Sequence, residues 1–410
     1  MPLRLPTSSP VFLIAAVCTA QVLAQLGAFT FFALLPTFFQ EWGLSHSQAG
    51  ILNGIIFGAY ALIVPFVVPL TDRIDPRRIY ICAVVLTTFS HLGMAFIADG
   101  FWDGFVFRAL AGIGWGGTYM VGLKALADLV EGPTQSRAVA FHAASIGIGG
   151  SLSFVLAGWA ADSVSWQTAF QISAAGSFLA LLVMAFLVPR RTPVPLDDQG
   201  WLSTFIRALK NKSAIAYSLG YLVHTWELFT LRSWVVTFLV FTAAQEGGPP
   251  NFLIPTVIAM LMELTGTASS VFGNEVAIRV GRRRWILMVM FASMAMGAIV
   301  GFSAGAGYGV AATICLIYNV LIYADSASLT AGAVGTAEPG RRGATLAVHG
   351  MLGYGGGFLG PLFLGVILDV LGGETVMNWG IAFAHVSVIM VIGPLAIKLL
   401  KPGELPGDKV

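Results

Sequence analysis

Long apolar stretches recur along the whole chain, and they constrain its fold more than any other feature. A helix crosses the hydrocarbon core of a bilayer in about 20 residues, and charged or glycine- and proline-rich breaks divide the 410-residue chain into stretches of at least that length. Only 10% of the residues are charged, too few to cover a soluble globule. We therefore expect an all-α membrane protein with twelve transmembrane helices, at residues 11–39, 48–70, 79–98, 102–127, 138–160, 167–188, 213–243, 252–275, 285–304, 308–333, 344–368 and 379–399.

The basic residues predict which side of the membrane each loop faces, because Lys and Arg favour short cytoplasmic loops. Of the 22 basic residues, all but three lie in alternate loops or near the two ends of the chain. These are Arg4, Arg73, Arg77, Arg78, Arg137, Arg190, Arg191, Arg207, Lys210, Lys212, Arg279, Arg282, Arg283, Arg284, Arg341, Arg342, Lys398, Lys401 and Lys409. Both termini are therefore expected in the cytoplasm, and Arg108, Lys124 and Arg232 fall inside predicted helices.

Short landmarks recur at an offset that drifts from 206 to 213 residues, which indicates an internal repeat. The matches are Asp72-Arg73 with Ile278-Arg279, Ala140-Phe141-His142 with Ala347-Val348-His349, Gly158 and Asp162 with Gly365 and Asp369, and Trp166 to Phe170 with Trp379 to Phe383. We expect two six-helix halves in parallel repeat, residues 1–188 and 213–410, joined by a cytoplasmic linker at 189–212.

The loop after the second predicted helix carries a charged motif. It runs from Val68 through Asp72 and Arg73 to Arg77 and Arg78, and the corresponding loop in the second half keeps Arg279, Arg282 and Arg283 but has Ile278 in place of the acid. This motif resembles the GxxxDRxGRR pattern of the major facilitator superfamily, with both glycines replaced in the first copy. The resemblance implies that the loops latch a cytoplasmic gate through charge-assisted hydrogen bonds. The alternative is that the bases only set the topology.

The fourth predicted helix resembles a second pattern of that family. Arg108-Ala-Leu-Ala-Gly112-Ile-Gly114 matches RxxxGxG, which implies a part in proton coupling. The GxxxGPxxG pattern of drug/proton antiporters is absent from the fifth helix, where Gly147-Ile-Gly149-Gly150 lacks the proline. The resemblance covers nearly the whole chain and implies a monomeric carrier of the twelve-helix branch in the bacterial inner membrane.

Three acidic residues, Glu227, Glu263 and Asp325, fall close to the middle of predicted helices. An ionisable residue at mid-membrane costs at least about 2.5 kcal/mol, so each is a candidate functional group. Helical spacing places further polar or aromatic residues on the same faces. These are His224 beside Glu227, Tyr318 beside Asp325, Trp115 and Tyr119 below Arg108, Gln21 with Gln25, and Thr256, Ser270 and Asn274 in line with Glu263.

The buried charges allow two interpretations. Three acids and three bases could pair and merely hold the helices together, yet all three acids lie in the second half while two of the bases lie in the first. We favour Glu227 or Asp325 as a proton carrier, with Arg232 as modulator or anion ligand. His224 is a possible proton relay. Lys124, sixteen residues from Arg108, is assigned to the inner vestibule.

The leading hypothesis is proton-coupled secondary transport, by alternating access, of a small polar organic solute, including an organic anion. Proton-driven efflux of cationic or amphipathic compounds is the alternative, and a cavity with both signs of charge leaves the solute's charge open. The sequence has no nucleophile motif, no GxxxxGK[ST] loop and no metal-ligand cluster, since Cys18, Cys82 and Cys315 stand alone. We therefore expect neither an enzyme nor a cofactor, a metal or a nucleic-acid partner.

Overall fold

The computed structural model describes residues 9–130, 133–191, 201–250, 253–338, 341–403, 405 and 408. Within these ranges every regular element is a helix and no strand is present. Some residues with a predicted cytoplasmic location lie outside the described residues: Arg4, Lys409 and linker residues 192–200.

The helices follow the twelve predicted stretches, each of which coincides with one helix or with consecutive shorter ones. The first half contains α1 (Pro10–Gln25), α2 (Thr30–Ala33), α3 (Leu35–Glu41), α4 (His46–Leu70), α5 (Pro76–Phe96), α6 (Phe101–Gly116), α7 (Tyr119–Leu129), α8 (Pro133–Ser163) and α9 (Trp166–Leu187). After α10 (Trp201–Lys210), the second half contains α11 (Lys212–Ala244), α12 (Pro255–Val280), α13 (Arg282–Val300), the 3-10 helix η1 (Gly301–Ala306), α14 (Tyr308–Tyr323), α15 (Ser326–Gly335), α16 (Arg342–Val370), α17 (Val376–Met390) and α18 (Ile392–Leu400).

Eleven helical segments of the described chain are long and apolar enough to cross a membrane. The predicted fourth helix, which is divided into α6 and α7 at Gly117 and Thr118, is not among these eleven segments. The chain is thus a multi-pass helical membrane protein, and the count of twelve spans stays a prediction.

Two helices are interrupted at corresponding positions of the repeat. Thr118 precedes α7 at the break in the first half, and Asp325 precedes α15 at the break in the second half, 207 residues later. Thr118 donates its hydroxyl to the Trp115 carbonyl, 3.0 Å away, whereas Asp325 turns toward another helix. Both halves therefore have a helix break at this position, but the residue at the break is a threonine in the first half and an aspartate in the second.

The first predicted helix is also broken, between α1 and α2. A break in a membrane helix frees backbone groups that must find partners inside the protein. Here the backbone N–H of Phe29 donates to the Ser153 hydroxyl on α8, 3.0 Å away, and the Thr30 hydroxyl lies 3.0 Å from that of Ser173 on α9. The corresponding helix of the second half, α11, is continuous over 33 residues.

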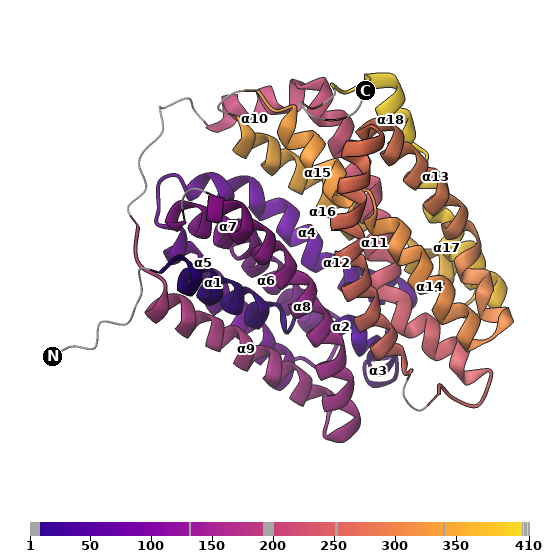
Figure 1. Ribbon diagram of the computed structural model, residues 1–410. Helices are drawn as coiled ribbons and strands as arrows, with labels where there is room; N and C mark the ends of the chain where they lie inside the picture. The colour runs from indigo at the N-terminus through magenta and orange to yellow at the C-terminus, as the bar shows by residue number, and fades with distance from the viewer. Residues whose placement is uncertain are drawn as a thin grey trace.

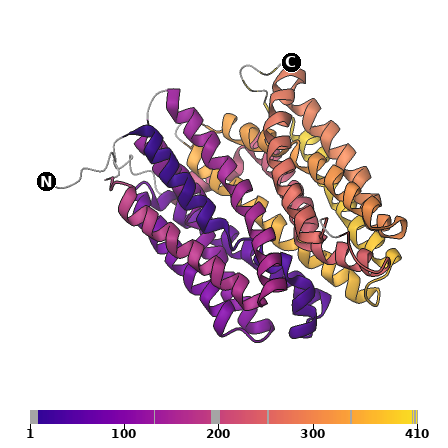
Figure 2. The same cartoon turned by 60° about the horizontal axis from the view of Figure 1, so that its bottom comes forward.

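The two halves lie side by side and meet along two pairs of helices (Figures 1 and 2). One pair is α4 with α16, and the other is α8 with α12. The repeat relates these pairs to each other, since α4 corresponds to α12 and α8 to α16. Glycines permit the close approach: a Cβ atom on Gly54 would collide with the Phe358 carbonyl across the interface.

The bundle has two ends, which we name by their residues. The linker end carries α10, Asp72 and Arg282, and the far end carries His46 and Asp369. Asp369, at the end of α16, accepts hydrogen bonds from the backbone N–H groups of His46 and Ser47, at 3.0 and 2.7 Å, and also lies 2.9 Å from His46 Nδ1. The second half thus caps the first turn of α4 in the first half and ties the far end shut.

Candidate functional site

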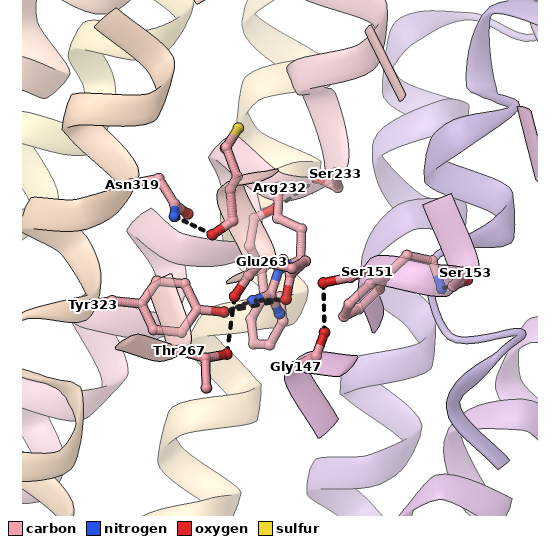
Figure 3. A network of polar contacts seen from close by, with 12 residues as sticks. Gly147, Ser151, Ser153, Arg232, Ser233, Glu263, Thr267, Asn319 and Tyr323 are labelled. Carbon is pink, nitrogen blue, oxygen red and sulfur yellow. Dashed lines mark hydrogen bonds and ion pairs between the residues drawn. The ribbon is translucent and has the colours of Figure 1, made fainter. Parts of the chain in front are cut away.

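An ion pair lies where the second half faces the first. Arg232 on α11 and Glu263 on α12 are both buried, with Nε 2.5 Å from Oε1 and Nη2 donating to Oε2 at 3.0 Å. The Tyr323 hydroxyl contacts the same guanidinium and lies 3.4 Å from Glu263 Oε2. Figure 3 shows these three side chains converging from different helices. The pair is neutral as a unit, so this part of the site is consistent with the pairing interpretation.

Aromatic rings hold the Arg232 guanidinium on two sides. Phe29 comes from the first half, with its ring centroid 4.6 Å away, and Phe229 from the second half, at 5.0 Å. Gly150 on α8 also approaches Glu263 from the first half. If the halves separated, Phe29 and Gly150 would move away from the ion pair. Arg232 and Glu263 would then be exposed to solvent or to a solute between the halves.

The second acid, Asp325, is paired with a histidine. Its Oδ1 lies 2.9 Å from His224 Nδ1, and both side chains are buried. The ring of Tyr221 stacks against that of His224, with centroids 5.5 Å apart. His224, one turn from Glu227 on α11, is buried, and its partner, Asp325 on a different helix, was not predicted.

Glu227, the third acid, has no basic partner. It is 1% exposed and accepts a hydrogen bond from the Ser293 hydroxyl at 3.1 Å. Tyr318 lies beside it, and the Asp325 carboxylate is close enough to repel it. Within the described part of the chain no Lys, Arg or His side chain lies within ion-pair distance of Glu227. Among the described residues, Glu227 is therefore the buried acid that lacks a basic partner.

Arg108 is the corresponding buried base without an acid. It is 3% exposed, contacts the Leu52 carbonyl through Nε, and has its guanidinium carbon 4.3 Å from the Phe31 ring centroid and 5.2 Å from that of Phe32. Its Nη2 has no hydrogen-bond partner among the described residues. Among the described residues no acid of the second half forms an ion pair with it in this conformation.

An aromatic cluster fills the centre of the interface between the halves. Phe57 stacks on Phe229 with ring centroids 3.8 Å apart, and Tyr60 lies 3.8 Å from Tyr354, each pair joining one half to the other. Trp115, from the predicted stripe below Arg108, belongs to this cluster at 6.0 Å from Tyr354. Aromatic side chains therefore fill the interface between the half that carries Arg108 and the half that carries the acids.

The other predicted residues lie at the margins of this region. Tyr119 packs near His142 at 5.7 Å, and the hydroxyl of Tyr80 donates to Gln21 Oε1 at 3.3 Å within the first half. Gln25 is buried against Gly149. Of the residues in line with Glu263, Asn274 accepts a hydrogen bond from Arg282 at 2.9 Å.

The charged loops bind helix ends within their own halves. Lys124 Nζ lies 3.9 Å from Asp72 Oδ1, and Arg77 Nε donates to the Met184 carbonyl at 2.8 Å. Arg279 pairs with Glu275 one turn away, at 2.9 Å, and Arg282 pairs with Asp408, at 2.8 Å. Arg73 and Arg283 also have polar or electrostatic contacts, whereas the role predicted for Arg78 rests on the sequence alone. Lys124 thus belongs with the loop motif at the linker end.

An open groove lies between the halves on the linker side of the ion pair. It has a volume of about 630 Å³ and is walled by α8, at Ala144, Gly147 and Ile148, and by α12, from Leu264 to Glu275. The volume is in the range of small-molecule sites. The walls are mainly apolar, and Val271 and Phe272 point outward with 70% of their surface exposed.

Sequence reasoning missed several residues that join the two halves. Phe29, Phe57 and Phe229 resembled ordinary apolar residues, and no pattern distinguished them from lipid-facing phenylalanines. Asp369 was visible only as a landmark of the repeat. Its position at the end of a predicted helix, where a carboxylate can reach a neighbouring helix N-terminus, is the signal that could have revealed it.

Comparisons with known proteins agree on the fold. The sequence profile of the Major Facilitator Superfamily matches residues 17–361. Protein spinster homolog 3 of Danio rerio is 25% identical over 243 residues, 57% of this chain and 49% of that protein. The chain spans about half the length of the curated relatives it matches.

Two solved structures extend the likeness to nearly the whole chain. A bacterial homolog of the human lysosomal transporter Spinster, in an inward-facing and unoccupied conformation, superposes with a TM-score of 0.72 at 15% identity, covering 96% of this chain and 95% of that chain. The nucleoside transporter NupG gives a TM-score of 0.77 at 14% identity, over 95% and 99% of the two chains. At these identities the likeness concerns the fold.

Proposed function

The chain belongs to the Major Facilitator Superfamily, and from this premise we propose that it carries a small polar organic solute across the membrane by alternating access, coupled to protons. The observation that carries the proposal is the pair of uncompensated buried charges, Arg108 in one half and Glu227 in the other. A buried charge without a partner is costly, so a stable protein retains one only where a ligand or a proton satisfies it during function.

Alternating access is supported by the unequal contacts at the two ends. At the far end, Asp369 of one half binds the first turn of α4 in the other. At the linker end, the contacts made by Asp72, Arg77 and Arg282 stay within a half, and α8 and α12, which touch at Gly147 and Thr267, line an open groove. This arrangement is the one expected of a carrier closed at the far end and open at the linker end. We propose that the linker end is cytoplasmic, with both termini there, in a bacterial inner membrane, and that the carrier works as a monomer.

Glu227 is the better candidate of the two acids for the proton carrier. A proton removes the cost of burying its carboxylate, and the Ser293 and Tyr318 hydroxyls can hydrogen-bond either form. Asp325 already has His224 as partner and acts as the second member of the coupling site. The proximity of the two carboxylates means that ionisation of one disfavours ionisation of the other, which links their proton occupancy.

The solute is proposed to be an organic anion or a zwitterion. Arg108 is the one predicted site cation without a carboxylate partner among the described residues, so a carboxylate of the solute would complete it once the halves move. Arg232 is already neutralised by Glu263 and can bind an anion only after that pair opens. The aromatic cluster would then pack against the apolar part of the solute.

A ligand screen followed by a flux assay tests the proposal. Purified protein is heated with carboxylates, amino acids, nucleosides and cationic drugs, since a ligand that binds only the folded state raises the melting temperature. The stabilising compound is then offered to proteoliposomes with an imposed proton gradient. We expect a carboxylate to stabilise the protein and to accumulate against its gradient. Accumulation that ignores the proton gradient would overturn the coupling.

A second candidate function is export of amphipathic or cationic compounds. The apolar groove between α8 and α12, with its outward-pointing Val271 and Phe272, favours this alternative because it offers apolar compounds a route from the lipid. Cationic drugs would then be the stabilising ligands, and cells that lack the protein would become sensitive to them.

A further inference from the structure

The charged loop of the second half lacks both members of an ion pair that the first half possesses. In the first half, Asp72 in the loop after α4 lies 3.9 Å from Lys124 on α7 and ties the loop to that helix. At the repeat offset of 206 residues, Asp72 corresponds to Ile278 and Lys124 to Thr330. The second half must therefore tie its loop to α15 by other means.

Arg282, at the start of α13, provides that connection. Its Nη1 donates to the Ser328 carbonyl on α15 at 3.2 Å and to Asn274 Oδ1 on α12 at 2.9 Å. The guanidinium is 3% exposed, and such a buried cation needs a carboxylate. Ile278, which lies one turn from Asn274 and four residues before Arg282, cannot supply one.

Asp408, from the tail beyond the last helix, supplies the carboxylate. Arg282 Nε donates to Asp408 Oδ2 at 2.8 Å and Nη2 to Oδ1 at 3.0 Å, the two-pronged geometry of a strong arginine–carboxylate pair. The Asp408 side chain is also 3% exposed. With Asn274 and Ser328 on Nη1, every nitrogen of the Arg282 guanidinium has a partner.

Three further contacts hold the tail across the linker end of the second half. The Gly403 N–H donates to the Ser213 hydroxyl at 3.0 Å, and the Tyr217 hydroxyl donates to the Gly403 carbonyl at 3.3 Å, which fixes the tail to α11. Leu405 packs against Gly335 at the end of α15. Asp408 then reaches the turn between α12 and α13. The described tail residues thus contact the linker ends of three helices, α11, α13 and α15.

We propose that this tail is a built-in strap in which Asp408 replaces the acid missing at position 278. The strap neutralises Arg282, holds the turn between α12 and α13 against α15, and makes the linker end of the second half one body. The Asp72 and Lys124 pair does the same for the first half. Only the consequence for transport, that the second half rocks as a unit, rests on the proposed function.

The test moves the carboxylate from the tail back to the loop. In the purified full-length chain, Asp408→Asn is expected to lower the melting temperature and to speed hydrogen exchange of the backbone amides between Ile278 and Arg283. Adding Ile278→Asp to Asp408→Asn is expected to restore both, whereas adding Ile278→Asn is not. Asp408→Glu should behave like the wild type. Glu275→Gln is the matched control, because it removes an acid from the same turn whose pair with Arg279 is exposed.

Two results would overturn the strap. One is an Asp408→Asn protein with wild-type melting temperature and exchange, and the other is a double variant in which Ile278→Asp does no better than Ile278→Asn. If Asp408→Asn yields no folded protein, recovery by Ile278→Asp supports the strap and lack of recovery contradicts it. Neither measurement needs a solute or a proton gradient, so failure of the strap is distinguishable from failure of the transport proposal.

Discussion

The tie between Asp369 and the first turn of α4 allows a quantitative prediction about the gate at the far end. Asp369 belongs to the second half of the bundle and α4 to the first. The contact between them therefore exists only while the far end is closed. Asp369→Ala removes two hydrogen bonds to backbone N–H groups, those of His46 and Ser47, and a side-chain contact with His46. The loss therefore acts on the closed state alone and shifts the equilibrium toward opening.

The size of the shift follows from the contacts. Loss of a side chain that caps a helix N-terminus costs about 0.5–2 kcal/mol, and a partly exposed ion pair adds about 0–1 kcal/mol. A total of about 0.5–3 kcal/mol changes the ratio of open to closed molecules by about 2- to 150-fold. Asp162→Ala is the matched control, because Asp162 corresponds to Asp369 in the repeat and is exposed, with no hydrogen bond among those of the described residues.

Distances between spin labels at the far end measure this equilibrium. Cys18, Cys82 and Cys315 are first replaced, and labels are attached at Asp99 and Met377, which are exposed on opposite halves. We expect a single short distance in the background protein and a longer population in Asp369→Ala. A distance distribution that is unchanged in Asp369→Ala, or that changes as much in Asp162→Ala, would refute this account of the gate.

Three other experiments test the remaining contacts. Replacing either Arg232 or Glu263 alone by Met strands a buried charge and should cost about 3–5 kcal/mol of unfolding free energy, whereas the double replacement should cost less than the sum of the two, as a double-mutant cycle by thermal unfolding would show. Arg108→Met should raise the melting temperature, because it removes an uncompensated buried charge, and should abolish stabilisation by the solute; a lower melting temperature would contradict the assignment. Gly54→Leu should force α4 away from α16 and lengthen the far-end spin-label distance, and an unchanged distance would show that the close approach is dispensable.

The sequence was informative wherever a local pattern determines the structure. Stretches of about 20 apolar residues can satisfy their backbone in lipid only as helices, so the helical stretches followed from composition and spacing. Burial of Glu227, Glu263 and Asp325 followed as well, because each stands within such a stretch. His224, one turn from Glu227, is buried as well.

The partners of these residues were beyond the sequence, because they depend on how helices pack. Nothing local indicates that Glu263 pairs with Arg232 or that Asp325 pairs with His224. The breaks at Thr118 and Asp325 were unforeseen too, since neither carries a proline at the break. Asp408 is the clearest example of a partner that the sequence does not reveal. It lies in a tail without a recognisable pattern and pairs with Arg282 of the charged loop, 126 residues earlier.

The central claim is that Glu227 carries the coupled proton while the two halves alternate. The most direct test measures solute and proton flux together in proteoliposomes, for the wild type and for Glu227→Gln, with the stabilising carboxylate as solute. We predict that the wild type accumulates solute with proton movement, and that Glu227→Gln still exchanges solute across the membrane but no longer accumulates it under a proton gradient. Proton-driven accumulation that persists in Glu227→Gln would contradict the account.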